Sequence, residues 1–173
     1  NDFLDRVGRD KATLIMHTEP KDPNGQDLDA IKDRLGFDDD QFKLSTNKLS
    51  MEQLSVLYNA SDCTINISDA EGFGLATLES LATETPIIVN MTGGLQEQVT
   101  DGENWFGFGI EPCSKAIIGS QEVPWIYEDR ISGGDLVDAM VKMFELPDEE
   151  RQEMGKKGRE HVLKNYSMEN YIQ

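Results

Sequence analysis

Residues 63–79 read CTINISDAEGFGLATLE, and this stretch decides the fold. Residues 63–67 are mostly apolar, which is typical of a short strand buried in a sheet. Polar residues follow, and Gly-Phe-Gly at residues 72–74 opens a segment that is apolar on nearly every side as far as residue 83. Such a segment is expected to be a buried helix. A buried strand that leads through a glycine-rich loop into a buried helix indicates a parallel α/β fold.

The same alternation continues on both sides of this stretch. Apolar runs predict strands at residues 12–17, 41–45, 86–90 and 105–110, and amphipathic patterns predict helices at residues 27–35, 50–58 and 135–146. A more polar, exposed helix is predicted at residues 148–165. Asp27 is placed to cap the first of these helices. Strands that alternate with helices favour an α/β, Rossmann-like parallel sheet with helices on both faces. The length of 173 residues fits a single domain.

Residues 111–130 interrupt the pattern. Pro112, Gly119 and Pro124 divide this segment, and the sequence predicts a long irregular loop. Loops of this length are usually functional or mobile.

Composition excludes several classes of protein. The chain has 33 acidic and 16 basic residues and a formal net charge of −17, whereas nucleic acid requires a face rich in Lys and Arg. No apolar run approaches the ~18 residues that suggest a membrane span, and the N-terminus lacks the pattern of a signal peptide. Cys63 and Cys113 are interpreted as free thiols of a cytoplasmic protein. No Cys/His cluster has the spacing of metal ligands, so no metal site is predicted.

The residues around Gly74 predict an anion site. The first amides of a helix have no partner inside the helix, and the helix dipole adds roughly half a positive charge at that end. Gly72 and Gly74 would let the backbone approach a phosphate closely. Such a site could hold a diphosphate even on an acidic protein.

Two carboxylates frame this predicted site. Glu71 precedes the helix, and Glu79 lies within it. A carboxylate can accept two hydrogen bonds at once, which suits the neighbouring hydroxyls of a ribose or another sugar. From the spacing alone, the alternative is an acidic residue that favours the helix dipole, followed by an exposed helical Glu.

The motif from Glu71 to Glu79 resembles the Glu-x7-Glu signature of retaining GT-B glycosyltransferases, in particular family 4, the group 1 type. Four further segments share the resemblance: LYNASD at 57–62, TPIIV at 85–89, Gly93-Gly94 with Glu97, and DGEN at 101–104. In order and spacing the similarity covers residues 12–166. It implies one half of a GT-B fold, which binds a nucleotide-diphosphate sugar and transfers the glycosyl group to a glycan or another hydroxyl acceptor.

The resemblance also implies roles for individual residues. Glu71 would contact the donor sugar near the reacting carbon, as the catalytic residue, and Glu79 would hold the ribose. The backbone of Gly72, Phe73, Gly74 and Leu75 would hold the sugar and the diphosphate. Enzymes of this type generally need no metal, so no cofactor is expected.

A second set of candidates follows another strand. Ser45 ends the strand predicted at 41–45, and Thr46 and Asn47 follow it, at the edge where parallel α/β sheets bind ligands. Backbone contacts with the nucleobase are one interpretation, and an ordinary turn is the other. His17 ends the strand at 12–17 on the same edge, where packing at the strand end is favoured over a place in the donor cleft.

The resemblance also predicts missing parts. The donor domain of the family begins with a strand that lies between those predicted here at 12–17 and 63–67, so residues 1–173 are expected to lack that first strand. Direct pairing of these two strands would contradict this prediction. The N-terminal acceptor-binding domain is also expected to be absent, so this chain alone should bind a donor weakly and transfer nothing.

Two rival functions stay open. One is a different GT-B enzyme, a sugar-nucleotide epimerase or a phosphorylase, which the Glu-x7-Glu spacing disfavours. The other is a non-catalytic donor-binding subunit that works with a separate acceptor-binding chain.

Overall fold

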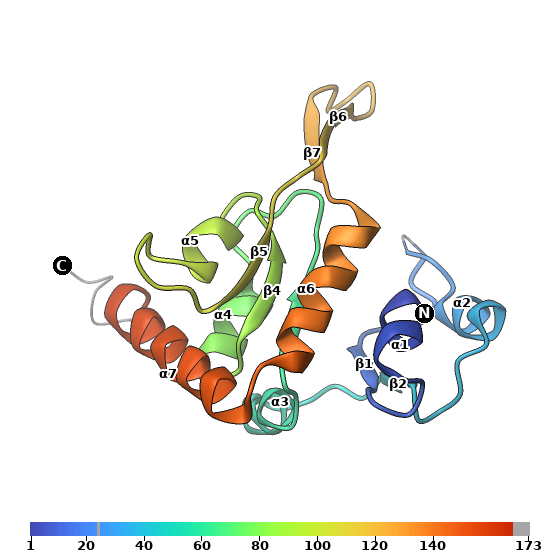
Figure 1. Cartoon of the computed structure of the whole chain (residues 1–173). Helices are drawn as coiled ribbons and strands as arrows, with labels where there is room; N and C mark the ends of the chain where they lie inside the picture. The colour runs from blue at the N-terminus through green and yellow to red at the C-terminus, as the bar shows by residue number, and fades with distance from the viewer. Residues whose placement is uncertain (24, 168–173) are drawn as a thin grey trace. The chain divides into compact units, whose positions relative to one another are not determined.

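The computed structural model describes residues 1–23 and 25–167. The chain divides into two compact units, Asn1–Ser50 and Met51–Gln173 (Figure 1). The first unit contains α1 (Asp2–Val7), β1 (Leu14–His17), α2 (Leu28–Leu35) and β2 (Phe42–Ser45). β1 and β2 are parallel, with Leu14 opposite Phe42. The predicted cap of α2 is confirmed, because the Asp27 side chain accepts a hydrogen bond from the Ala30 backbone N–H at 3.0 Å.

The prediction that residues 12–17 form a buried strand is correct for the strand and wrong for its burial. Leu14 is 45% exposed and Ile15 is 39% exposed. Within the described residues β1 has one strand neighbour, β2. An apolar run indicates a strand that can be covered on both faces, but burial requires neighbouring elements that this unit does not contain.

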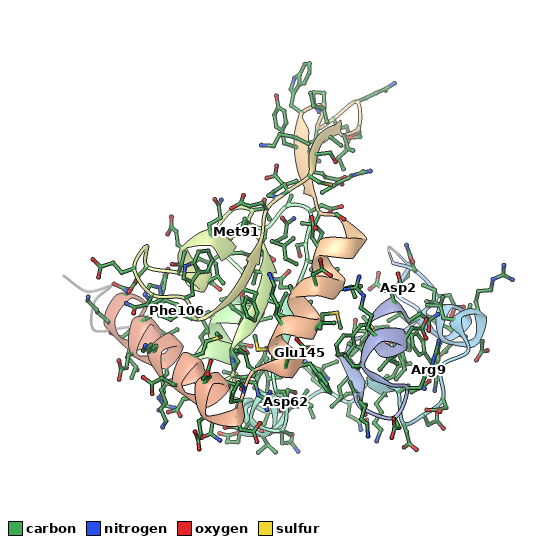
Figure 2. The ribbon with its side chains drawn as sticks, in the orientation of Figure 1. Asp2, Arg9, Asp62, Met91, Phe106 and Glu145 are labelled. Atoms are coloured by element: carbon green, nitrogen blue, oxygen red, sulfur yellow. The ribbon has the colours of Figure 1, made fainter. Side chains whose placement is uncertain are left out.

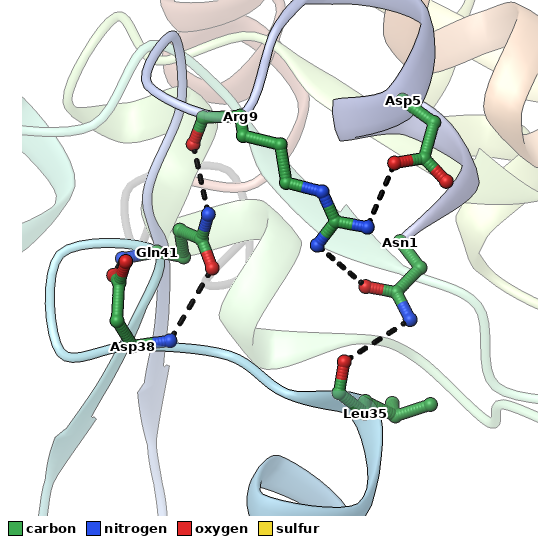
Figure 3. A network of polar contacts seen from close by, with 6 residues as sticks. All are labelled: Asn1, Asp5, Arg9, Leu35, Asp38 and Gln41. Carbon is green, nitrogen blue, oxygen red and sulfur yellow. Dashed lines mark hydrogen bonds and ion pairs between the residues drawn. The ribbon is translucent and has the colours of Figure 1, made fainter.

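A polar network joins the elements of the first unit (Figure 3). The Arg9 guanidinium donates to the Asp5 carboxylate at 2.7 Å and to the Asn1 side-chain oxygen at 3.2 Å. The Gln41 amide donates to the Arg9 backbone oxygen at 3.0 Å. Arg9 therefore serves the packing of this unit around α1, which gives this basic residue a structural role.

The second unit has a three-stranded parallel sheet in the order β3-β4-β5. Its elements are, in chain order, α3 (Met51–Asn59), β3 (Thr64–Asn66), α4 (Leu75–Ala82), β4 (Ile87–Asn90), α5 (Leu95–Val99), β5 (Gly107–Ile110), β6 (Ser114–Ile118), β7 (Ile126–Arg130), α6 (Gly133–Glu145) and α7 (Asp148–Asn165). The strands and helices predicted outside residues 111–130 are found as far as residue 165, with small differences at the ends. A further helix, predicted to begin at Ser167, would continue into residues 168–173, which lie outside the described residues.

Helices cover both faces of this sheet, as predicted. On one face, Ile87 and Val89 pack in a cluster with residues of α4, α5 and α7 and with Phe106, which directly precedes β5 and is labelled in Figure 2. On the other face, Ile88 packs against Ala139 and Met143 of α6. Consecutive residues of β4 thus enter opposite cores, as the alternation of side chains along a strand requires.

The prediction of an irregular loop at 111–130 is wrong. β6 and β7 form an antiparallel hairpin in which Ser114 is opposite Arg130 and Ile118 is opposite Ile126. The hairpin extends away from the sheet of the second unit (Figure 1), and Trp125 and Tyr127 are 73% and 53% exposed. The breakers of the pattern lie outside the paired segments, at Pro112, Gly119 and Pro124. They mark the limits of the two strands, whereas the prediction took them as signs of an irregular loop.

Two further expectations concern α4 and the strand pairing. α4 is buried on one side only, because Leu81 is fully buried whereas Leu75 is 66% exposed at its N-terminal end.

Among the described residues β1 pairs with β2, and β3 pairs with β4, in separate sheets. β1 and β3 belong to different units of the chain, so the missing strand stays a prediction. No helix of the described residues is long and apolar enough to cross a membrane.

Candidate donor site

The loop from the end of β3 to the start of α4 contains the predicted site residues 71–74 of the second unit, and Leu75 and Glu79 follow in α4. It follows the carboxyl end of a parallel strand, where α/β sheets bind their ligands. Gly74 is the N-cap of α4 and has a φ of +89°, a left-handed conformation that glycine adopts without strain. No side chain caps the helix. The first turn of α4 therefore keeps its amides available.

The backbone carbonyls of this loop point into the protein. Most of them accept a hydrogen bond from a residue of another segment or from α4 itself. The pairs are Ser68 with the Asn90 side-chain amide at 2.9 Å, Asp69 with the Asp129 backbone N–H at 2.7 Å, Gly72 with the Gly94 N–H at 3.3 Å, Phe73 with the Gln98 side-chain amide at 2.6 Å, and Gly74 with the Leu78 N–H at 3.2 Å.

The backbone amides of the same loop have the opposite arrangement. Within residues 1–23 and 25–167, no N–H from Asp69 to Thr77 donates to a protein acceptor. A carbonyl and the next N–H belong to one planar trans peptide and point in opposite directions. The five bonded carbonyls therefore turn the N–H groups of the residues that follow them, Asp69, Ala70, Phe73, Gly74 and Leu75, the opposite way. Consecutive amides turned outward, as at residues 73–75, form an anion-binding concavity.

Gly93 and Gly94 hold the loop from behind. A Cβ atom on Gly93 would lie 1.7 Å from the Glu71 carbonyl oxygen, and one on Gly94 would lie 2.7 Å from the Phe73 carbonyl oxygen. Gly93 also has a φ of +49°. The glycine pair is thus more than a turn, because it permits the backbone of the donor loop to approach closely.

The base of the hairpin meets the same loop. Besides donating through its backbone to Asp69, Asp129 accepts a hydrogen bond from the Thr92 hydroxyl at 2.9 Å and pairs with Lys115 at 3.1 Å. The bond from Thr92, followed by that from Lys115, lowers the pKa of the Asp129 carboxyl. Asp129 therefore remains a carboxylate that joins β7, the end of β4 and the donor loop.

Glu71, the predicted catalytic residue, is half-buried at the carboxyl end of β3. Its carboxylate lies 3.5 Å from the side-chain amide nitrogen of Asn66, the last residue of β3. Asn66 is itself oriented, because its side-chain oxygen accepts from the Ser68 hydroxyl at 2.8 Å and from the Ser68 N–H at 3.1 Å. Asn66 thus directs its donor group toward Glu71.

Glu79, the predicted ribose ligand, is half-buried on α4. The Tyr58 hydroxyl of α3 donates to its carboxylate at 3.1 Å, and Tyr58 is its one hydrogen-bond partner among the described residues. Burial, and then the Glu79 charge, raises the pKa of Tyr58, so Tyr58 stays a neutral donor. One carboxylate oxygen of Glu79 is left to accept from a ligand hydroxyl.

The predicted nucleobase residues lie in the first unit. Ser45 ends β2, and Thr46 and Asn47 follow it as exposed residues. The His17 Nδ1 lies 3.0 Å from both the backbone and hydroxyl oxygens of Ser45. His17 therefore contacts the end of the neighbouring strand, which agrees with the predicted packing at the strand end.

Several residues of the donor loop's surroundings escaped the sequence analysis: Asn66, Asn90, Gln98 and Tyr58. Asn66 and Asn90 each end an apolar strand, which is a readable signal for the ligand-binding edge of a sheet. Gln98 had a weaker signal, as a polar residue next to the apolar Val99 on a short helix.

Comparison with known proteins shows the family of this chain. The family described as "Glycosyl transferases group 1" matches residues 39–161. A trehalose synthase of Pyrococcus horikoshii is 28% identical over 145 residues, which cover 80% of this chain and 29% of that protein. The chain thus spans less than a third of the length of this curated relative.

Solved structures show the fold. A glycosyltransferase of Rickettsia africae superposes with a TM-score of 0.68 at 19% identity, covering 97% of this chain and 39% of that one. The C-terminal domain of a glycosyl transferase group 1 family protein of Francisella tularensis superposes with a TM-score of 0.55 at 23% identity, covering 82% and 61%. The predicted α/β fold, that of the GT-B glycosyltransferases, is confirmed.

Proposed function

This chain belongs to the glycosyl transferases group 1 family, and we propose that it is the donor-binding domain of a retaining, hexosyltransferase-type enzyme. In this proposal it binds a nucleotide-diphosphate sugar, and the glycosyl group passes to an acceptor hydroxyl. The observation that carries the proposal is the donor loop, in which carbonyls bond inward and the N–H groups of residues 69–77 have no acceptor within the described residues.

The leaving diphosphate explains why such a loop would be useful. Negative charge develops on the diphosphate as the glycosidic bond breaks. Amides that are already oriented stabilise this charge without reorganising during the reaction. The N-terminal end of α4 adds its dipole. We propose that these groups stabilise the diphosphate without a metal ion. This local stabilisation matters more on a chain with a net charge of −17, because the overall field repels an anion.

Glu71 and Glu79 then have separate roles. Glu71, beside the strand end and oriented near Asn66, would accept hydrogen bonds from the donor sugar. Glu79, whose second oxygen is available, would accept from the ribose hydroxyls. Gly72, Phe73, Gly74 and Leu75 would contribute their amides. The acceptor is proposed to bind a separate N-terminal domain, since the chain spans 29% of the trehalose synthase that it resembles.

Calorimetric titration with UDP, GDP and ADP tests the donor site. We expect one nucleotide to bind, and Glu79→Ala to weaken it by about ten- to a hundredfold, since a hydrogen bond to a charged group contributes about 1.5–3 kcal/mol. Glu103→Ala is the matched control, because it removes the same charge from an exposed position. Glu103 lies on the loop between Thr100 and Trp105, which form an isolated β-bridge.

Two results would count against this proposal. If none of the three nucleotides binds, donor binding by this chain is contradicted. If one binds and the Glu79 and Glu103 variants behave alike, the ribose is held elsewhere, and only the role of Glu79 is lost.

A further inference from the structure

We propose that Gln98 is a positioning residue of the donor site, whose buried side-chain amide holds the Phe73 carbonyl inward and so presents the Gly74 N–H to the diphosphate. The effect on diphosphate binding rests on the proposed function. The orientation of the peptide between Phe73 and Gly74 does not depend on it.

The contacts of Gln98 define its orientation. Gln98 and Thr77 are both fully buried. The Gln98 amide nitrogen lies 2.6 Å from the Phe73 carbonyl oxygen, and its amide oxygen lies 2.6 Å from the Thr77 hydroxyl. A carbonyl only accepts, so the group of Gln98 that faces Phe73 must be the NH2. The amide oxygen then faces the hydroxyl, which can donate to it.

The peptide between Phe73 and Gly74 transmits this contact to the site. Its carbonyl and its N–H point in opposite directions because the unit is planar and trans. Gly74 is the N-cap of α4, with a φ of +89°, and a Cβ there would lie 2.6 Å from a methyl group of Leu95 on the helix that bears Gln98. The donor loop and α5 are therefore in close contact at this peptide.

Stability alone is a poor reason for a glutamine here. Leu95 and Val99, on the same short helix, are fully buried apolar residues of the core. Burying an amide in such surroundings is unfavourable unless each of its polar atoms is bonded. Gln98 meets that condition through two partners in other segments. A leucine would fill similar space and would have no polar atoms to bond. The amide is therefore better explained by the Phe73 carbonyl that it holds.

Two substitutions test the inference. Gln98→Met keeps the length of the side chain and removes the donor. Gln98→Glu places a carboxylate that cannot donate when ionised, but whose hydroxyl can donate to Phe73 once it is protonated. Gln96→Met is the control, since Gln96 is an exposed residue of the same helix.

Two measurements are made on the full chain. The first is the pair of amide resonances of Phe73 and Gly74 in an NMR spectrum without ligand, which we expect to move in Gln98→Met and not in Gln96→Met. The second is the Kd of the nucleoside diphosphate that the wild type binds. We expect it to rise about tenfold in Gln98→Met, equivalent to the loss of roughly 1.4 kcal/mol.

The pH dependence separates positioning from packing. In Gln98→Glu the Kd should be raised at pH 8 and return toward the wild-type value as the pH falls and the new carboxyl is protonated. A loss of packing alone would lower the melting temperature without this recovery. Unchanged Phe73 and Gly74 resonances in Gln98→Met, or an unchanged Kd in a nucleotide-binding protein, would overturn the inference. If the wild type binds no nucleotide, the proposed function fails, and the resonances still decide the geometry.

Discussion

Gly93→Ala is expected to abolish measurable nucleotide binding while leaving the protein folded. An alanine Cβ would lie 1.7 Å from the carbonyl oxygen of Glu71 and 2.9 Å from its carbonyl carbon, so the donor loop would have to move. Gly93 also has a φ of +49°, which costs a residue with a Cβ about 1–2 kcal/mol. Because the displaced carbonyl lies within the loop that carries the outward amides, we expect the Kd for the nucleoside diphosphate to rise at least about a hundredfold, a change of roughly 2.7 kcal/mol.

Gly102→Ala provides the control for Gly93→Ala. Gly102 has a φ of +92°, yet a Cβ there would meet nothing within 4 Å. It therefore carries a similar backbone penalty without displacing the loop. Calorimetric titration and thermal unfolding of both variants separate the two effects. Equal affinities in the wild type and Gly93→Ala would mean that the loop tolerates the shift, and that its present geometry is not needed for the ligand.

Gly155→Ala is expected to destabilise the second unit strongly, although alanine usually stabilises a helix relative to glycine. Gly155 is buried on α7, and a Cβ there would lie 1.9 Å from the backbone oxygen of Glu84. Glu84 itself has a φ of +64°, so the turn after α4 has little freedom to move away. Overpacking of this kind costs about 3 kcal/mol, or about 10 °C in melting temperature for a chain of this size.

Gly133→Ala is the matched helical substitution. Gly133 is the first residue of α6, and a Cβ there would meet nothing within 4 Å. We expect this variant to gain up to about 1 kcal/mol, because alanine restricts the unfolded chain. The two variants should therefore differ in the sign of their effect in urea unfolding. A Gly155→Ala protein as stable as the wild type would show that α7 can separate from Glu84 at little cost.

Local patterns were sufficient for the elements and their order. Apolar runs predicted the five strands β1 to β5, and Asp27 predicted the start of α2. These features depend on residues within one or two turns of each other. The position of Glu71 and Gly74 between a strand and a helix was readable for the same reason, and with it the region of the proposed donor site.

The hairpin was not readable. Residues 114–118 and 126–130 become strands through pairing with each other, and Pro112, Gly119 and Pro124 hid them among loop signals. A two-stranded ribbon has little hydrophobic burial of its own, so its side chains lack the clear alternation of a half-buried strand. Its base at Asp129 then reaches Asp69, across 60 residues of sequence that no local pattern spans.

The sequence by itself determined a glycine-rich loop between a strand and a helix, and the tertiary structure decided which way the peptides of that loop face. The direction of each carbonyl depends on a donor from a distant segment: Asn90 for Ser68, Asp129 for Asp69, Gly94 for Gly72 and Gln98 for Phe73. Hydrogen-bond donors occur throughout any sequence, and only packing brings a particular one within reach of a particular carbonyl.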